Sequence, residues 1–192
     1  MVLVDTGCRS TFVRQIMGLR LGSIGIVALL GLGLGLPACG GDEENAPAST
    51  EAVSRAADQL DAMNVPYRWG GGHDDPAVPD PGLDCSSTVA WVLQHAGWDV
   101  PTPSTETLPS RWSGILEPWN SLQRGVFVAN HPDPDGSGGR SGHVFLVIND
   151  RKFQNTSLDH RGAAWVGPYT ITRGSFTEGS HDFVVWHVRG TS

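Results

Sequence analysis

Cysteine is scarce in this chain of 192 residues, and the three that occur are Cys8, Cys39 and Cys85. Such a small, odd number excludes the disulfide framework of a small secreted scaffold, so each thiol needs its own explanation. Charged residues are also few, at 17%, and the net charge of −7 leaves no basic excess for binding phosphates. This excludes a general nucleic-acid binder. The sequence shows no internal repeat, and its length and 39% hydrophobic content favour a single globular domain.

The first 38 residues are typical of an export signal. Three arginines precede an uncharged run, LGSIGIVALLGLGLGL (21–36), whose 16 residues are too few for a membrane-spanning helix of about 20. The run leads into Leu36-Pro37-Ala38-Cys39, which resembles the bacterial lipobox. In signals of that kind the cysteine is diacylated and the chain is cut before it. Met17 begins a shorter signal of the same type and is an alternative start.

We expect Cys39 to carry lipid and to hold the protein in the cell envelope, on the outer face of the cytoplasmic membrane. Residues 39–48 are polar and acidic, and they predict a flexible linker before a domain that spans 49–192. The alternative is an ordinary cleaved signal, which would leave Cys39 as a free thiol and release a secreted protein. Because the chain lacks a basic patch, contact with the lipid bilayer would depend on the acyl chains.

The domain divides into a helical first part and a strand-rich second part. Apolar residues recur at helical spacing after Ser49, as far as Asn64. A second helix is predicted from the capping sequence Asp84-Cys85-Ser86-Ser87 to Gly97. Short runs with strand composition follow at 125–130, 143–149, 151–156 and 183–188, with Asn149-Asp150 as a tight hairpin turn. This order predicts an α+β fold with a central antiparallel β-sheet.

Cys85 is the strongest candidate for a catalytic residue. It falls at the predicted start of the second helix, where backbone N–H groups and the helix dipole favour a thiolate over a thiol. A nucleophilic cysteine needs such a lowered pKa, a nearby base and a group that orients the base. The alternative is a buried structural cysteine, but that is expected in mid-helix on the apolar face rather than at an exposed first turn.

His143 and Asn155 are the candidates for the base and its orienting group. His143 opens the apolar run HVFLVIN directly after a glycine-rich loop, so its imidazole can face a cleft. Asn155 lies in the next run, beyond the hairpin turn, where its side-chain oxygen can accept the Nδ1–H of His143. Taken alone, either residue would pass as an ordinary residue at the edge of a sheet.

Three motifs together resemble those of the NlpC-type cell-wall cysteine peptidases. They are PYRWGGG (66–72), GLDCSS (82–87) and GHV (142–144), and they occur in the family's order over most of the domain. The resemblance implies a papain-like minimal fold and an enzyme that cuts the peptide stems of peptidoglycan. It further implies Cys85 as nucleophile, His143 as general base and acid, and Asn155 as orienting residue, since papain-like triads accept Asn there.

The resemblance also implies a substrate-binding set of residues. Tyr67, Asp84 and Ser86 match positions at which the family holds the amino end of the stem peptide or shapes the oxyanion site. The loop between 72 and 82 is longer than is usual in the family, and Ser87 stands where a glycine is usual. We therefore expect altered access of the substrate, with the same chemistry.

The predicted function is that of an exported cysteine hydrolase, with the bond between D-Glu and the diamino acid of the stem peptide as its target. We expect the reaction to run through an acyl-enzyme in a monomer, without a cofactor. One alternative is an amidase of the same fold that cuts between muramic acid and L-Ala. Another is a lipoprotein that binds wall peptides without catalysis.

Two other polar clusters have simpler explanations. The sequence HPDPD from His131 to Asp135 matches half of a zinc-peptidase signature, but the HxH half is absent. His73-Asp74-Asp75 can line a cleft, although such a sequence is typical of a polar surface loop. We therefore expect no metal site.

Overall fold

Three helices precede all strands in the described part of the chain. The computed structural model describes residues 48–74, 81–132, 142–157 and 162–192, all within the compact unit Gly41–Ser192. The predicted signal (1–38) and Cys39 lie outside the described residues. The elements are α1 (Thr50–Ala62), α2 (Cys85–His95), α3 (Leu108–Arg111), β1 (Leu116–Pro118), β2 (Val126–His131), β3 (His143–Ile148), β4 (Arg151–Gln154), β5 (Ala164–Pro168), β6 (Ser175–Glu178) and β7 (His181–Val188).

Local capping explains where the two long helices begin. At the start of α1, the hydroxyl of Ser49 accepts a hydrogen bond of 3.2 Å from the backbone N–H of Ala52. At the start of α2, Asp84 and Ser87 form a capping box, in which each side chain accepts the backbone N–H of the other residue. Both predicted helices are confirmed.

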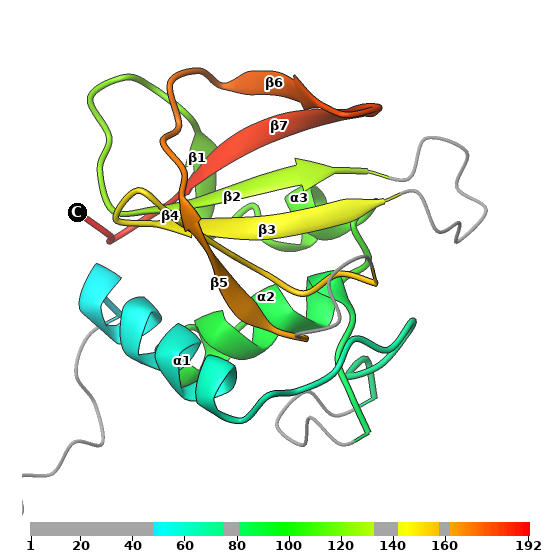
Figure 1. Ribbon diagram of the computed structural model, residues 1–192. Helices are drawn as coiled ribbons and strands as arrows, with labels where there is room; N and C mark the ends of the chain where they lie inside the picture. The colour runs from blue at the N-terminus through cyan, green and yellow to red at the C-terminus, as the bar shows by residue number, and fades with distance from the viewer. Residues whose placement is uncertain (1–47, 75–80, 133–141, 158–161) are drawn as a thin grey trace, which may run out of the picture. The chain divides into compact units, whose positions relative to one another are not determined.

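The strands form one antiparallel sheet in the order β1-β7-β2-β3-β4-β5, and β6 pairs with β7. Figure 1 shows α1 and α2 below the sheet and β6 above β7. The four predicted strands correspond to β2, β3, β4 and β7, whereas β1, β5 and β6 were not predicted. The arrangement confirms the predicted α+β fold with an antiparallel sheet.

Side chains alternate between the two faces of the sheet, and each face carries its own buried cluster. On one side, which we call the helix face, Val144, Leu146 and Ile148 of β3 share a cluster with residues of α1 and α2. The other side, which we call the aromatic face, carries a smaller cluster of Phe127, Ala129, Phe145, Val147, Phe183 and Val185. Residues at the start of β3 therefore face one of two separate environments.

The two ends of the described domain lie together. The hydroxyl of Thr50 donates to the carbonyl of Ser192 at 3.1 Å and accepts the Ser192 N–H at 3.1 Å. Figure 1 shows the C-terminus near the start of α1, drawn in cyan. These hydrogen bonds tie the end of the chain to the first helix.

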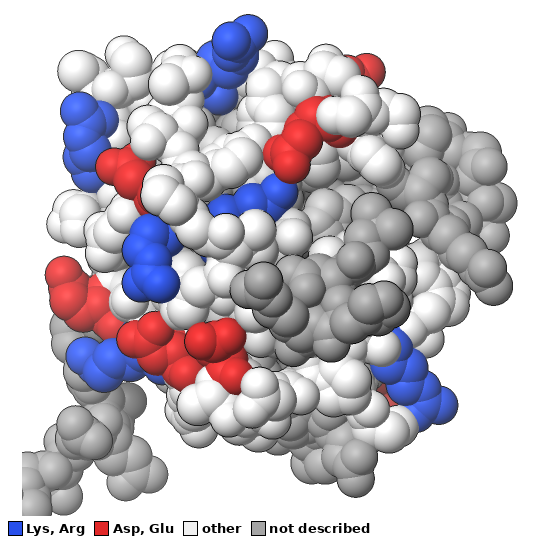
Figure 2. Space-filling model, in the orientation of Figure 1, with Lys and Arg blue, Asp and Glu red and all other residues white. Residues whose placement is uncertain are grey.

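The surface over α1 is acidic. Its sequence, TEAVSRAADQLDA, includes Glu51, Asp58 and Asp61, and Figure 2 shows acidic side chains gathered over this helix. None of the helices in the described part of the chain has the length and apolar character needed to cross a bilayer.

Candidate active site

Cys85 is the first residue of α2, and a second segment of the chain lies beside it. Tyr67 and Leu83 form a parallel bridge, which brings Tyr67 close to Asp84 and Cys85. Burial raises the pKa of the Tyr67 hydroxyl to about 12, and the charges of Cys85 and Asp84 add to this shift. The hydroxyl of Ser86 donates to Oδ1 of Asp84 at 3.0 Å. The structure thus brings Tyr67, Asp84, Cys85 and Ser86 together.

The environment of Cys85 differs from the expected exposed first turn. Its side chain is 6% exposed and belongs to the cluster on the helix face. Burial raises the pKa of the thiol to about 12, and the charge of Asp84 acts in the same direction. Backbone hydrogen bonds, including one with Val144, oppose this shift but do not outweigh it. The expected lowering of the thiol pKa is therefore wrong for this conformation, because desolvation exceeds the effect of the helix start.

His143 directs its imidazole to the aromatic face. The centroid of its ring lies 5.9 Å from that of Phe145 and 6.2 Å from that of Phe183. Nε2 of His143 lies 3.2 Å from Oε1 of Gln154, which accepts a hydrogen bond when the imidazole proton is on Nε2. Burial lowers the pKa of His143 to about 4; the hydrogen bond to Gln154 opposes this shift, and the charge of Lys152 adds to it. At neutral pH the imidazole is uncharged.

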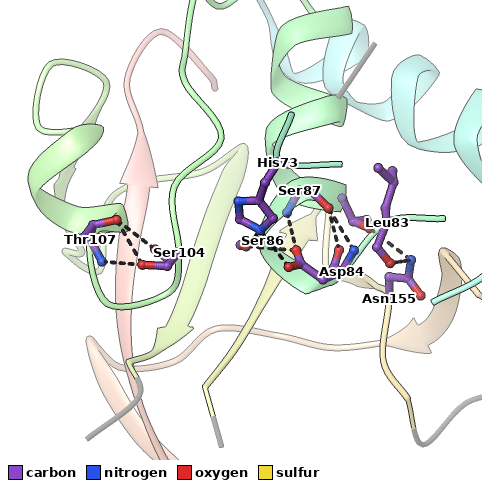
Figure 3. Close-up of polar contacts among 9 residues, drawn as sticks. His73, Leu83, Asp84, Ser86, Ser87, Ser104, Thr107 and Asn155 are labelled. Atoms are coloured by element: carbon purple, nitrogen blue, oxygen red, sulfur yellow. Dashed lines mark hydrogen bonds and ion pairs between the residues drawn. The ribbon is translucent and has the colours of Figure 1, made fainter. Parts of the chain in front are cut away.

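Asn155 is fully buried and contacts the start of α2. Its Nδ2 donates to the carbonyl of Leu83 at 3.0 Å and to Oγ1 of Thr88 at 3.1 Å (Figure 3 shows the first contact). Its Oδ1 is buried without a hydrogen-bond partner among the described residues. The structure does not bring Asn155 to the imidazole of His143, because Gln154 takes that contact.

The alternation of side chains along β4 explains why Gln154 replaces Asn155 at the imidazole. Phe153 pairs with Leu146, a residue of the helix face. Successive side chains point to opposite faces, so Gln154 falls on the aromatic face with His143, and Asn155 returns to the helix face. Counting outward from the predicted hairpin turn puts Gln154 opposite Phe145, diagonally from His143 on the same face, and puts Asn155 opposite Val144 on the other face.

His73 is a further member of the site, although the sequence favoured a plain surface loop. Its Nε2 lies 2.7 Å from Oδ2 of Asp84 and 3.4 Å from Oγ of Ser86 (Figure 3). The hydrogen bond to Asp84 is the main cause of a raised pKa for His73. Burial acts to raise the pKa of Asp84, yet hydrogen bonds from His73 and Ser87 lower it overall. The contact joins residues eleven apart across a loop, and no local sequence signal predicts it.

The group formed by His73, Asp84 and Ser86 is not a serine-hydrolase triad. In such a triad the carboxylate and the hydroxyl bind different nitrogens of the imidazole, so that a proton can pass through the ring. Here both partners contact Nε2 of His73. The group is an ion pair with an added hydroxyl.

No group of three or more His, Cys, Asp or Glu side chains that could hold a metal ion occurs in the described ranges. His131 belongs to β2, and its Nδ1 lies 2.8 Å from the carbonyl of Asp182. The two acidic residues of the HPDPD sequence, Asp133 and Asp135, lie outside the described residues.

The fold and the site define a small α+β domain in which a cysteine begins a helix that packs on an antiparallel sheet. A family model for the NlpC/P60 family matches residues 64–167, more than half of the chain, and the chain belongs to this family. The family consists in general of cysteine peptidases that act on peptidoglycan, so membership indicates a cell-wall peptidase. A search of curated protein sequences found no significant match.

Proposed function

We propose that the protein is an exported, papain-like cysteine hydrolase that cleaves the bond between D-Glu and the diamino acid of peptidoglycan stem peptides. The observation that carries the proposal is the position of Cys85. It begins α2, and its thiol lies beside the backbone of Val144, the residue directly after His143. The nucleophile therefore adjoins the first residues of the strand that carries the base.

The proposed reaction requires the imidazole of His143 to leave Gln154 and reach the helix face, which needs a change of backbone conformation at His143, the first residue of β3. There the buried Oδ1 of Asn155, which has no partner among the described residues, is an acceptor for Nδ1–H of His143. Once its proton has moved from Nε2 to Nδ1 by exchange with solvent, the imidazole Nε2 would face Cys85 and take the proton of the thiol. An adjacent imidazolium lowers the pKa of a thiol, so formation of the pair also activates the nucleophile.

Once the pair has formed, the thiolate of Cys85 attacks the amide carbonyl. The backbone N–H of Cys85, at the start of α2, donates to the oxyanion. His143 gives its proton to the leaving amine, and the acyl-enzyme remains. His143 then removes a proton from the water that hydrolyses the thioester, which restores the free enzyme. None of these steps requires a cofactor.

Asp84, Ser86 and Tyr67 form the proposed substrate-binding group. The carboxylate of Asp84 and the hydroxyl of Ser86 lie next to Cys85 along the first turn of α2. A carboxylate with a hydroxyl beside it recognises an ammonium group, which suits the amino end of a stem peptide. Tyr67 lies near Asp84 and Cys85, in the segment that pairs with Leu83.

Incubation of the purified protein with muropeptides tests the proposal, with mass spectrometry of the products. We expect fragments cut between D-Glu and the diamino acid, and no cleavage by Cys85→Ala. The variant Cys39→Ala is the matched control, because it removes a cysteine outside the site and should retain cleavage. Cleavage by Cys85→Ala would contradict the proposed nucleophile. Release of a stem that begins with L-Ala would instead identify the amidase of the same fold.

A lipoprotein that binds wall peptides without cutting them is the second candidate. The buried, neutral thiol of Cys85 and the imidazole on the opposite face of the sheet favour it. Labelling by iodoacetamide distinguishes the two candidates. Fast labelling of Cys85 at a pH below that for a free thiol supports the hydrolase. Slow labelling that persists with muropeptides bound supports the binder.

We also propose that residues 1–38 direct export and that Cys39 is lipidated, with 39–48 as the tether of a monomeric domain at the outer face of the cytoplasmic membrane. The support is the lipobox-like sequence before Cys39. Incorporation of radioactive palmitate into the protein, and its loss in Cys39→Ala, would test lipidation. Recovery of the unlabelled protein in the medium would support the secreted alternative.

A further inference from the structure

The carboxylate of Asp84 is bound from two sides. Its Oδ1 accepts the N–H of Ser87 at 2.8 Å and the hydroxyl of Ser86 at 3.0 Å, both from α2. Its Oδ2 accepts a hydrogen bond of 2.7 Å from Nε2 of His73, a residue of a different segment (Figure 3). The helix thus orients the carboxylate, and His73 takes the oxygen that the helix leaves free.

His73 is more exposed to solvent than Asp84, whose Oδ2 it contacts. The side chain of His73 is 31% exposed, whereas that of Asp84 is 10% exposed. A cation that enters from solution to pair with Asp84 must therefore compete with the imidazole for Oδ2. A neutral ligand has no such competitor.

The groups that face His73 favour its protonated form. Asp84, at the start of α2, raises the pKa of His73 through its hydrogen bond and its charge. The backbone of Thr102, in the segment that follows this helix, raises it through a hydrogen bond. Asp74, the next residue in the chain, adds a further negative charge. Together they outweigh the effect of burial, so the pKa of His73 lies above its ordinary value.

We propose that His73 is a specificity-determining residue whose imidazolium occupies the place of a substrate ammonium group on Asp84, so that an amine-bearing ligand binds by displacing it. This inference rests on the proposed function, in which Asp84 and Ser86 hold the amino end of the substrate. Displacement removes the carboxylate that stabilises the imidazolium, so binding of the amine is coupled to loss of a proton from His73. By linkage, protonation of His73 weakens the binding of amines.

Because of this coupling, the affinity for amines should be highest over a limited range of pH, a pH window. Affinity should rise as the pH rises through the pKa of His73 and fall again as the amine itself loses its proton, near pH 8 for an α-amino group. Ligands without an amine should bind with no such window. The site would thereby discriminate between stems with free and with blocked amino ends.

Titration of the histidines by NMR, in the purified wild-type protein, tests the inference. The probe is L-alaninamide, and N-acetyl-L-alaninamide is the matched ligand without a charge. The signal of His73 is identified by its loss in His73→Gln. His95, whose Nδ1 lies 2.9 Å from the carbonyl of Trp91 within α2, serves as internal reference. We expect L-alaninamide to lower the titration midpoint of His73 alone, and the acetylated ligand to shift neither residue.

Affinity measurements complete the test. At about pH 6, His73→Gln should bind L-alaninamide about fivefold more tightly than the wild type, as expected for the loss of one partly exposed charged competitor. An unchanged His73 midpoint, or equal affinities, overturns the inference even if muropeptides are cut. Failure to cut muropeptides overturns the proposed hydrolase even if the midpoint shifts, because L-alaninamide binding involves no cleavage.

Discussion

His143 and Asn155 lie on opposite faces of the β3–β4 hairpin. The imidazole contacts the ring of Phe183 on the aromatic face, whereas Nδ2 of Asn155 donates to the carbonyl of Leu83 on the helix face. The structure therefore separates the proposed base from its expected orienting group, and Gln154 contacts the imidazole instead. In the proposed reaction, the orientation of this one imidazole decides whether the site can react.

Replacement of Gln154 by leucine removes the acceptor for Nε2–H of His143. This hydrogen bond adds to the strand alternation that keeps the imidazole on the aromatic face, so we expect its loss, worth about 1 kcal/mol, to make muropeptide cleavage about fivefold faster. Gln94→Leu is the matched control, since Gln94 bonds to the carbonyl of Val100 outside the site. A slower reaction in Gln154→Leu would show that Gln154 itself orients the base.

The two hydrogen bonds of Asn155 predict a loss of stability when it is replaced. Asn155→Ala removes two hydrogen bonds and creates a cavity, although the carbonyl of Leu83 keeps the N–H of Arg68 as a donor, so the free energy of unfolding should fall by about 2–3 kcal/mol. Thr88→Val removes only one acceptor and should cost about 1 kcal/mol. Urea denaturation measures both values. Equal losses for the two variants would contradict this account.

The pair of His73 and Asp84 predicts a pH dependence of stability. The raised pKa of His73 gives a contribution that is complete below its unfolded value near 6.5 and is lost as the pH rises through the folded pKa. The lowered pKa of Asp84 gives a contribution that is present above about pH 4 and is lost as the pH falls through the folded pKa. The pair therefore stabilises the fold most between about pH 4 and 6.5.

We accordingly expect the free energy of unfolding to differ most between the wild type and His73→Gln near about pH 5, and less at about pH 8. Urea titrations at the two pH values measure this difference. The same difference at both values would show that the ion pair does not contribute.

Gly72 lies against the start of α2. Its φ is +78°, and a Cβ there would approach Cδ2 of Leu83 to 2.3 Å and Cβ of Ser87 to 2.8 Å. Gly72→Ala should therefore displace the capping box and lower the free energy of unfolding by about 2–3 kcal/mol. Gly70→Ala is the control: its φ of +67° is similar, but nothing lies within 4 Å of the added Cβ. Its cost should be about 1 kcal/mol, and equal thermal shifts would argue against the steric explanation.

Local signals were sufficient to predict the helices and the hairpin. The cap at Ser49, the capping box at Asp84 and the turn at Asn149-Asp150 each lie within a few residues of the element that they start or end. The strands β5 and β6 were missed because they are short and largely exposed, so their sequences carry little hydrophobic pattern. Their pairing depends on strands elsewhere in the chain.

The sequence predicted candidate residues for the site but not how their side chains are oriented. The face that His143 occupies depends on strand alternation relative to two clusters, and those clusters exist only in the assembled sheet. The burial of Cys85 depends on a cluster that brings together separate segments of the chain, among them Val53 of α1 and Val144 of β3. Electrostatic reasoning from the helix start alone therefore gave the wrong direction for the thiol pKa.

The hydrogen bonds between Thr50 and Ser192 have a consequence for the connectivity of the domain. A linker of a few residues could join these ends, and new ends could be opened at the turn of 120–123, where Leu122 is 88% exposed. Such a circular permutant would keep α2 and the β3–β4 hairpin uninterrupted. The order of the elements along the chain can thus be changed without changing the site that they form.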